Sequence, residues 1–330
     1  MQVVLHTPGF GSVVMSLLDF SSPLDAAAPR SRWAFGAARQ TFEATQPGEL
    51  RAVIDAAEAA ARAGAWVLGG LCYEAAPAFD AALQVQAPQP GQPLAWFAVY
   101  DEPQPWPQVP PAASAEVDWQ AQPLRADFDA ALAHIQQGIA AGAYYQVNYT
   151  GRLQGQLTGA PQALFAALQQ AQPGGYAAHI DCGAGRQWLS VSPELFFHWQ
   201  AGVDGSGAIL TRPMKGTAAR GADAASDAAQ AAQLRTAPKE RAENVMIVDL
   251  LRNDLARIAQ PHSVQVPRLF HTEALATVWQ MTSDVQAHTR VGTRLWDVFA
   301  ALFPCGSVTG APKVQAMRAI AALETAPRGL

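Results

Sequence analysis

Apolar residues recur along the chain with two periods, one helical and one extended. Between residues 128 and 139 they are spaced by four, three and four, which predicts one apolar stripe of an amphipathic helix ending at Gly142: Phe128, Leu132, Ile135 and Ile139. Alanine-rich segments at 53–63 and 222–234 predict two more helices.

Short apolar runs without helical spacing predict buried strands at 66–74, 94–100, 188–192 and 208–210. Residues 145–150 predict a strand of another kind, because apolar and polar side chains alternate there. Tyr145, Val147 and Tyr149 share the packed face, whereas Gln146, Asn148 and Thr150 share a polar face. That polar face either lines a cavity or lies half-exposed in a sheet.

Proline density marks the candidate domain boundary. Eight of the 24 prolines fall between Pro88 and Pro111, which predicts an extended connector or a pair of edge segments. We therefore expect an N-terminal region over 1–115 and a larger domain over 116–330.

Composition narrows the class of protein. Half of the 330 residues are apolar, 15% are charged and the formal net charge is −5, so the chain lacks the basic surface that nucleic acids require. The first 20 residues lack a positively charged N-terminal region, and Pro8 and Gly9 interrupt their apolar character. They therefore resemble neither a signal peptide nor a membrane anchor. Three widely spaced cysteines, an odd number, indicate free thiols in a reducing cytoplasm: Cys72, Cys182 and Cys305.

Cys72 is a candidate nucleophile of the glutamine amidotransferase type, a role that would place it in a turn with a glycine on each side. Ala75 and Ala76 supply no second glycine after the cysteine. A buried structural cysteine is therefore predicted.

Lys215 stands in the segment Thr-Arg-Pro-Met-Lys-Gly-Thr, which directly follows a predicted strand. Pro213 interrupts ladder pairing, and Gly216 lets the backbone approach a ligand closely. This setting indicates a functional lysine, although a surface turn with a solvated cation has the same composition.

Glu194 is a carboxylate among large apolar neighbours at the end of a predicted strand. If the side chain is buried, its pKa rises and it can act as a general acid at neutral pH; otherwise it is a solvated strand end. A turn at 204–207 predicts a hairpin that brings Glu194 and Lys215 together.

Pro238 opens a predicted helix that carries Glu240 and Glu243 on one face, and Asp254 returns to nearly the same azimuth. Adjacent carboxylates predict a Mg²⁺ site completed by waters and an anionic substrate. A solvated charged face, flanked by Lys239 and Arg241, is the alternative.

Residues 303–313 read Phe-Pro-Cys-Gly-Ser-Val-Thr-Gly-Ala-Pro-Lys and precede a predicted helix. Small residues and an early proline expose backbone N–H groups there, which predicts an anion at this end. The segment lacks the Gly-Lys-Ser/Thr ending of a nucleotide-binding loop, so the anion is a carboxylate or a phosphate.

Taken together, five blocks in this order resemble the chorismate-utilising enzymes, and within them the branch of aminodeoxychorismate synthase component I. The blocks are 145–148, 192–194, 212–217, 240–254 and 306–313, and the similarity runs from about Trp66 to the end. The resemblance implies an α+β fold in which two packed antiparallel β-sheets are flanked by helices.

Two positions separate the branches of that family. Anthranilate synthases typically have alanine at the position matching Lys215, where aminodeoxychorismate synthases have a lysine that attacks carbon 2 of chorismate. Isochorismate and salicylate synthases have a water-activating lysine where this chain has Gln146. The resemblance thus implies amination of chorismate at carbon 4.

The family's functional residues carry over to matching positions. Lys215 is implied as the nucleophile, Glu194 as the acid that protonates the departing hydroxyl, and Glu243 with Glu240 as ligands of Mg²⁺. The implied substrate-binding residues are Gly216, Thr217, Gly306, Ser307, Thr309 and Gly310. Ammonia is expected from a separate glutamine amidotransferase subunit.

The chain departs from its relatives in two places. Gln280 stands where family members carry a histidine, and relatives continue well beyond Leu330. We therefore expect an incomplete catalytic domain that leaves a bare sheet edge. Two alternatives to an aminodeoxychorismate synthase remain. One is an anthranilate synthase-like enzyme, and the other is a non-catalytic protein that binds chorismate or the amidotransferase.

Overall fold

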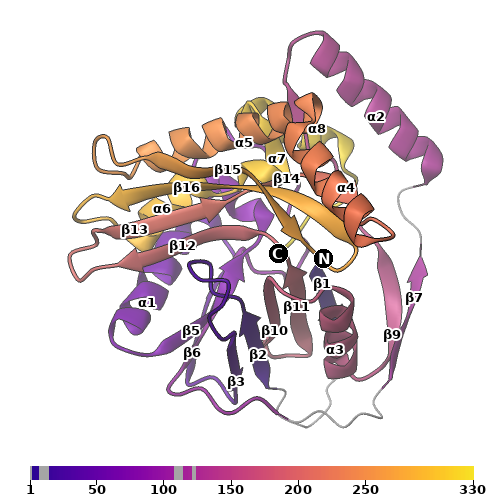
Figure 1. Cartoon of the computed structure of the whole chain (residues 1–330). Coiled ribbons are helices and arrows are strands. Elements are labelled where there is room, and N and C mark those ends of the chain that lie inside the picture. Colours follow the sequence, from indigo (N-terminus) through magenta and orange to yellow (C-terminus); the bar gives the residue numbers. More distant parts are fainter. Residues whose placement is uncertain (1, 7–14, 108–113, 121–123) are drawn as a thin grey trace. The chain divides into compact units, whose positions relative to one another are not determined.

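The structure is a computed structural model that describes residues 2–6, 15–107, 114–120 and 124–330 (Figure 1). The chain forms two compact units, each discontinuous in sequence. Residues 1–138, 149–193 and 321–330 make up the first unit, and residues 139–148 and 194–320 the second. The predicted domain division at residues 115 and 116 stays a prediction.

Among the described residues, the first unit holds three antiparallel sheets, with strand orders β1-β11-β10-β2-β3, β4-β6-β5 and β7-β9. The strands are β1 (Gln2–His6), β2 (Ser16–Phe20), β3 (Ser31–Phe35), β4 (Gln40–Ala44), β5 (Trp66–Leu71), β6 (Ala95–Tyr100), β7 (Ala115–Gln120), β9 (Gln154–Gly159), β10 (Tyr176–Asp181) and β11 (Arg186–Ser192).

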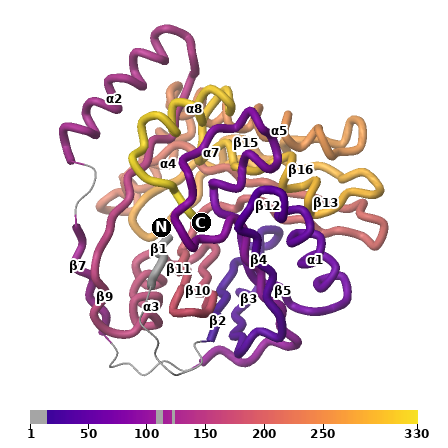
Figure 2. Tube along the Cα trace, turned by 180° about the vertical axis from the view of Figure 1, so that it is seen from behind, coloured from indigo at the N-terminus to yellow at the C-terminus, as the bar shows by residue number. Residues whose placement is uncertain are grey.

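Helices α1 (Leu50–Arg62), α2 (Arg125–Ala140) and α3 (Pro161–Ala171) and the 3₁₀ turns η1 (Pro47–Glu49) and η2 (Tyr73–Ala78) accompany these sheets. Helix α1 lies against the β4-β6-β5 sheet (Figure 2), where it buries Leu50, Ile54 and Ala57. The helices predicted at 53–63 and 128–142 correspond to α1 and α2, and the one predicted at 222–234 spans Ala224–Thr236. The stripe of α2 is only partly buried, however, because Phe128 and Ile139 are 38% and 42% exposed.

The strand predicted at 94–100 is confirmed as β6, which lies inside the proline-rich segment and interrupts the predicted connector. All six residues of β6 are buried, since β4 and β5 pair with it on both sides. Residues 108–111 of the predicted connector lie outside the described residues. The predicted strand at 66–74 ends at Leu71, because the chain then turns into η2.

Cys72 is buried, and its thiol donates a hydrogen bond to the carbonyl of Pro93 at 3.0 Å. Burial raises its pKa to about 12, so the thiol keeps its proton at neutral pH. The prediction of a structural cysteine is confirmed, and all three cysteines are free.

The second unit is built on a sheet of order β12-β13-β16-β14, with β15 also paired to β16 (Figure 1). Its strands are β8 (Gln146–Val147), β12 (Leu195–Ala201), β13 (Gly207–Arg212), β14 (Met214–Ala219), β15 (Gln265–Ala274), β16 (Val278–Thr289) and β17 (Gly310–Ala311). Its helices are α4 (Ala224–Thr236), α5 (Pro238–Ala256), α6 (Leu295–Leu302), α7 (Gly306–Thr309) and α8 (Lys313–Leu323), the last of which runs on into the first unit.

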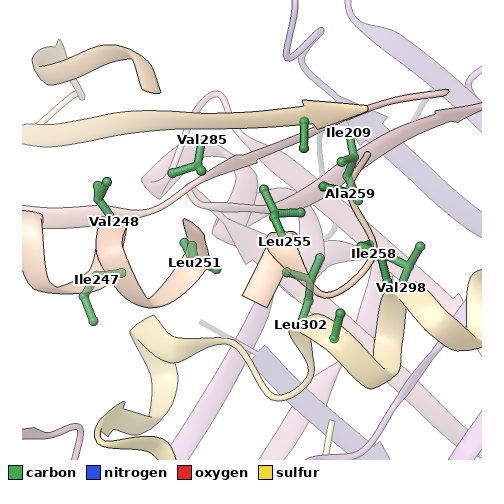
Figure 3. Close-up of a cluster of buried hydrophobic side chains, with 12 residues drawn as sticks. Ile209, Ile247, Val248, Leu251, Leu255, Ile258, Ala259, Val285, Val298 and Leu302 are labelled. Atoms are coloured by element: carbon green, nitrogen blue, oxygen red, sulfur yellow. The ribbon is translucent and has the colours of Figure 1, made fainter. Parts of the chain in front are cut away.

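Helix α5 and helix α6 close the core of the second unit against β13 and β16 (Figure 3). Leu251 and Leu255 of α5 meet Val285 of β16 and Ile209 of β13 in this cluster, and all four are at most 1% exposed. Pro238 at the first position of α5 starts the helix as predicted, since its missing N–H needs no partner there. The apolar face of α5 thus fixes where its glutamates lie.

The predicted strand at 145–150 is largely absent. It is reduced to Gln146 and Val147, which pair with Ala311 and Gly310, and the side chain of Tyr145 is 70% exposed rather than packed.

Within the described residues, no helix is both long enough and apolar enough to cross a bilayer.

Candidate functional site

A pocket of about 460 Å³ lies in the second unit, beside the junction of β13 and β14. Strands β13 and β14 both pair with β16 and are separated by Pro213, which has no N–H for the ladder. The lining residues are Glu194, Met214, Lys215, Gly216, Thr217, Glu240, Glu243 and Gln280. Six of the ten predicted site residues therefore meet in one cavity.

Lys215 is the second residue of β14 and is partly buried. Its ammonium group donates a hydrogen bond to the main-chain carbonyl of Ser307 at 3.0 Å. Behind it, the side-chain amide of Asn244 donates to the carbonyl of Lys215 at 3.4 Å, and the hydroxyl of Ser283 donates to Asn244 at 2.6 Å. Asn244 and Ser283 are at most 1% exposed, so they hold the backbone of Lys215 from inside the core.

Glu194 precedes β12 and reaches the same pocket, because β12 and β13 form the predicted hairpin. The main-chain N–H of Met214 donates to its carboxylate at 3.3 Å. Burial raises the pKa of Glu194, while the hydroxyl of Ser307, the charge of Lys215 and the Met214 N–H act in the opposite direction. The side chain is half-buried, and a pKa raised by burial suits general acid chemistry, whose assignment to Glu194 stays a prediction.

Gly216 has a φ of +100°, which other residues rarely adopt. A Cβ atom on this residue would lie 3.3 Å from a carboxylate oxygen of Glu240 and 3.2 Å from Cβ of Met281. The glycine therefore allows β14 and α5 to approach closely, while its predicted close approach to a ligand stays a prediction.

Glu240 and Glu243 both line the pocket from the first turns of α5. Nζ of Lys239 lies 4.0 Å from a carboxylate oxygen of Glu240 and 3.8 Å from one of Glu243, and the lysine side chain is 80% exposed. No group of three or more acidic, histidine or cysteine side chains gathers as a metal site in the described part of the chain. Two half-buried carboxylates in an open pocket still fit Mg²⁺, which takes its remaining ligands from water and substrate.

Asp254 does not line the pocket, although it lies at nearly the same azimuth of the helix as the two glutamates. Its carboxylate lies 2.8 Å from Nζ of Lys313 and is buried. The helix between Glu243 and Asp254 is long enough that they serve different parts of the unit.

Gly306, Ser307, Thr309 and Gly310 are buried and do not line the pocket. Ser307 instead contacts Lys215 through its carbonyl and Glu194 through its hydroxyl. Their predicted role in binding substrate, like the anion expected at this loop, stays a prediction.

Thr217 and Gln280 form the far side of the pocket, where the hydroxyl of Thr217 donates to the side-chain oxygen of Gln280 at 3.1 Å. Gln280 therefore presents a neutral amide to this pocket.

Sequence reasoning missed the supporting roles of Asn244, Ser283 and Met214. Asn244 directly follows Glu243, which could have drawn attention to it. Nothing in the local sequence indicates that its amide reaches a strand 29 positions earlier.

The profile of the chorismate binding enzyme family matches residues 102–330. An aminodeoxychorismate synthase of Streptomyces griseus is 40% identical over 232 residues, which is 69% of this chain and 31% of that protein. Anthranilate synthase component 1 of Streptomyces coelicolor is 36% identical over 220 residues, which is 67% of this chain and 42% of that protein. The chain therefore spans less than half the length of either relative.

Among solved structures, anthranilate synthase component I from Streptococcus pneumoniae superposes with a TM-score of 0.71 at 21% identity, covering 99% of this chain and 78% of that one. This likeness confirms the predicted α+β fold of antiparallel sheets flanked by helices. Because the family profile also covers more than half of the sequence, the chain belongs to the chorismate binding enzymes.

Proposed function

We propose that the chain is the component of an aminodeoxychorismate synthase that converts chorismate and ammonia to 4-amino-4-deoxychorismate. The observation that carries the proposal is the placement of Lys215 and the partly buried acid Glu194 in one pocket. The relative named aminodeoxychorismate synthase supports the same reaction.

In the first half-reaction, the amine of Lys215 attacks carbon 2 of chorismate and the ring double bonds shift. The hydroxyl leaves carbon 4 as water after Glu194 protonates it, and Glu194 regains a proton from the newly bonded lysine nitrogen. Covalent catalysis of this kind divides one difficult displacement into two easier ones.

In the second half-reaction, ammonia forms a bond to carbon 4, the double bonds shift back and the bond between carbon 2 and Lys215 breaks. The proton that ammonia loses passes to the departing lysine nitrogen. Chorismate and ammonia thus give 4-amino-4-deoxychorismate and water, and the lysine is returned unchanged.

Glu243 and Glu240 would hold Mg²⁺ at the pocket, where the ion supplies positive charge opposite the ring carboxylate of chorismate. Gly216 and Thr217 line the same cavity and would contact the substrate. A separate glutamine amidotransferase subunit would supply ammonia, in keeping with a relative named component 1. Three free thiols suit a cytoplasmic setting.

The test is to incubate the protein with chorismate, Mg²⁺ and an ammonium salt and to separate the products. The proposal expects 4-amino-4-deoxychorismate, detected as para-aminobenzoate after addition of the corresponding lyase. Anthranilate with pyruvate would instead favour the second candidate, an anthranilate synthase, to which one relative points by name. Chorismate binding without any product would favour a non-catalytic binding protein.

A further inference from the structure

Ser307 contacts both candidate catalytic side chains through two different groups. Its main-chain carbonyl accepts the hydrogen bond from Nζ of Lys215 at 3.0 Å. Its hydroxyl is hydrogen-bonded to the carboxyl group of Glu194. Because Ser307 is only 5% exposed, it lies behind the two side chains rather than in the open pocket.

The short helix α7 that carries Ser307 is held on several sides within the second unit. The hydroxyl of Thr309 donates to the carbonyls of Cys305 at 3.1 Å and Gly306 at 3.3 Å, and the N–H of Asn148 donates to the carbonyl of Thr309 at 2.8 Å. A Cβ atom on Gly306 would lie 2.4 Å from Cδ2 of Leu250, so α7 packs tightly on α5. Ser307 therefore has little freedom to move.

The direction of the hydrogen bonds at Ser307 follows from its second neighbour. Sγ of Cys305 lies 3.2 Å from the Ser307 hydroxyl oxygen. Burial raises the pKa of Cys305 to about 11, so its thiol is protonated at neutral pH and can donate to that oxygen. The single hydroxyl proton of Ser307 is then available for Glu194 when that carboxyl group is ionised.

On the basis of the proposed function, we infer that Ser307 is a positioning residue that holds Lys215 and Glu194 at a fixed separation and does not itself contact chorismate. Its carbonyl directs the lysine nitrogen, and its hydroxyl directs the carboxyl group that must reach the leaving oxygen. One residue of a rigid turn thereby sets the relative placement of nucleophile and acid. Misplacement of such groups by small distances lowers the rate strongly.

Loss of the Ser307 hydroxyl has a specific electrostatic consequence. A donor to an ionised carboxylate favours the ionised form, so its removal lets Glu194 retain its proton to higher pH. The other groups that face Glu194 are Lys215, the Met214 N–H and Cys305, and Glu240 and Glu243 line the same pocket. A Ser307→Ala substitution leaves all of these, and the Ser307 carbonyl, in place.

The experiment follows the carboxyl C=O stretching band of Glu194 by infrared difference spectroscopy across pH, with Glu194→Gln to assign the band. We expect the midpoint to move to higher pH in Ser307→Ala and to stay near the wild-type value in Ser307→Thr, which keeps the hydroxyl. An unchanged midpoint in a folded Ser307→Ala protein would overturn the inference. If Ser307→Ala does not fold, Ser307→Cys replaces it, because a thiol is a weaker donor and predicts a smaller shift in the same direction.

Kinetics give a second readout. We expect kcat of Ser307→Ala to fall by about tenfold or more, because Lys215 and Glu194 are misplaced, while KM for chorismate stays unchanged. A raised KM at constant kcat would instead mean that Ser307 binds substrate. The infrared titration needs no turnover. An inactive wild-type chain would therefore count against the proposed function, and an unmoved band against the role of Ser307.

Discussion

Nζ of Lys313 lies 2.8 Å from a carboxylate oxygen of Asp254, and the two side chains are 16% and 8% exposed. The pair joins the end of α5 to the first residue of α8. Burial raises the pKa of Asp254, while the positive charge of Lys313 acts in the opposite direction. The ion pair thus anchors the segment after α7 to the helix that carries the pocket glutamates.

Removal of one partner of this pair leaves a buried charge without compensation. We expect Lys313→Met to lower the free energy of unfolding by about 3–5 kcal/mol, as measured by urea denaturation. Asp254→Leu combined with Lys313→Met should recover most of that loss, because no charge then remains. A single variant within 1 kcal/mol of wild type would show that solvent reaches the pair.

Lys215→Ala should abolish any covalent adduct with chorismate, because the attacking amine is gone. Intact-protein mass spectrometry in the presence of chorismate and Mg²⁺, but without ammonia, detects the adduct, and peptide mapping locates it. Lys239→Ala is the matched control, since Lys239 is 80% exposed and should leave the adduct on Lys215. Production of 4-amino-4-deoxychorismate by Lys215→Ala at the wild-type rate would reduce the lysine to a structural role.

Glu194→Gln should stabilise the protein at neutral pH and not at acid pH. Burial raises the folded-state pKa above the unfolded value, so the wild-type protein loses stability as pH rises from the unfolded pKa through the folded one. The amide has no such loss, and each pH unit between the two pKa values contributes about 1.4 kcal/mol. Thermal unfolding at several pH values measures the difference. A Tm difference that does not grow with pH would contradict a buried, titrating carboxyl group.

Gly216→Ala tests the close approach of β14 to α5. The added methyl group would meet both an unfavourable positive φ and close contacts with Glu240 and Met281. Gly292→Ala is the control, because Gly292 also has a positive φ, of +84°, but a Cβ atom there would have open space around it. Backbone strain alone should cost about 1–2 kcal/mol in the control, and Gly216→Ala should cost more. Equal losses in urea denaturation would mean that Glu240 moves aside freely.

Glu243→Gln and Glu240→Gln should weaken Mg²⁺ binding by about tenfold or more, because each removes a charged oxygen ligand. Isothermal titration with Mg²⁺ in the presence of chorismate measures this directly, without turnover. Asp249→Asn is a control on the same helix, since its side chain is 74% exposed and outside the pocket. Equal affinities in all four proteins would remove the glutamates from the proposed metal site.

Local pattern was a good guide wherever the chain interacts mainly with its near neighbours. The stripe on α2, the proline start of α5 and the hairpin of β12 and β13 were all predicted, because capping, periodicity and turns act over a few residues. The alternation at 145–150 misled, since only Gln146 and Val147 find a partner strand. The apolar run at 94–100 correctly predicted β6 between proline-rich flanks, but only the packing of β4 and β5 on both sides makes it a central strand.

The sequence by itself determined the candidate chemistry: a lysine between proline and glycine, an acid after Ser-Pro, and two glutamates one helical turn apart. Tertiary structure decided which of these groups meet. By helical spacing Asp254 shares a face with the glutamates, but in the structure it pairs with Lys313. Ser307 lies behind the pocket, where it contacts both Lys215 and Glu194. Contacts of this kind join residues 59 and 92 positions apart, so they depend on how sheet and helices pack. No local spacing encodes that packing.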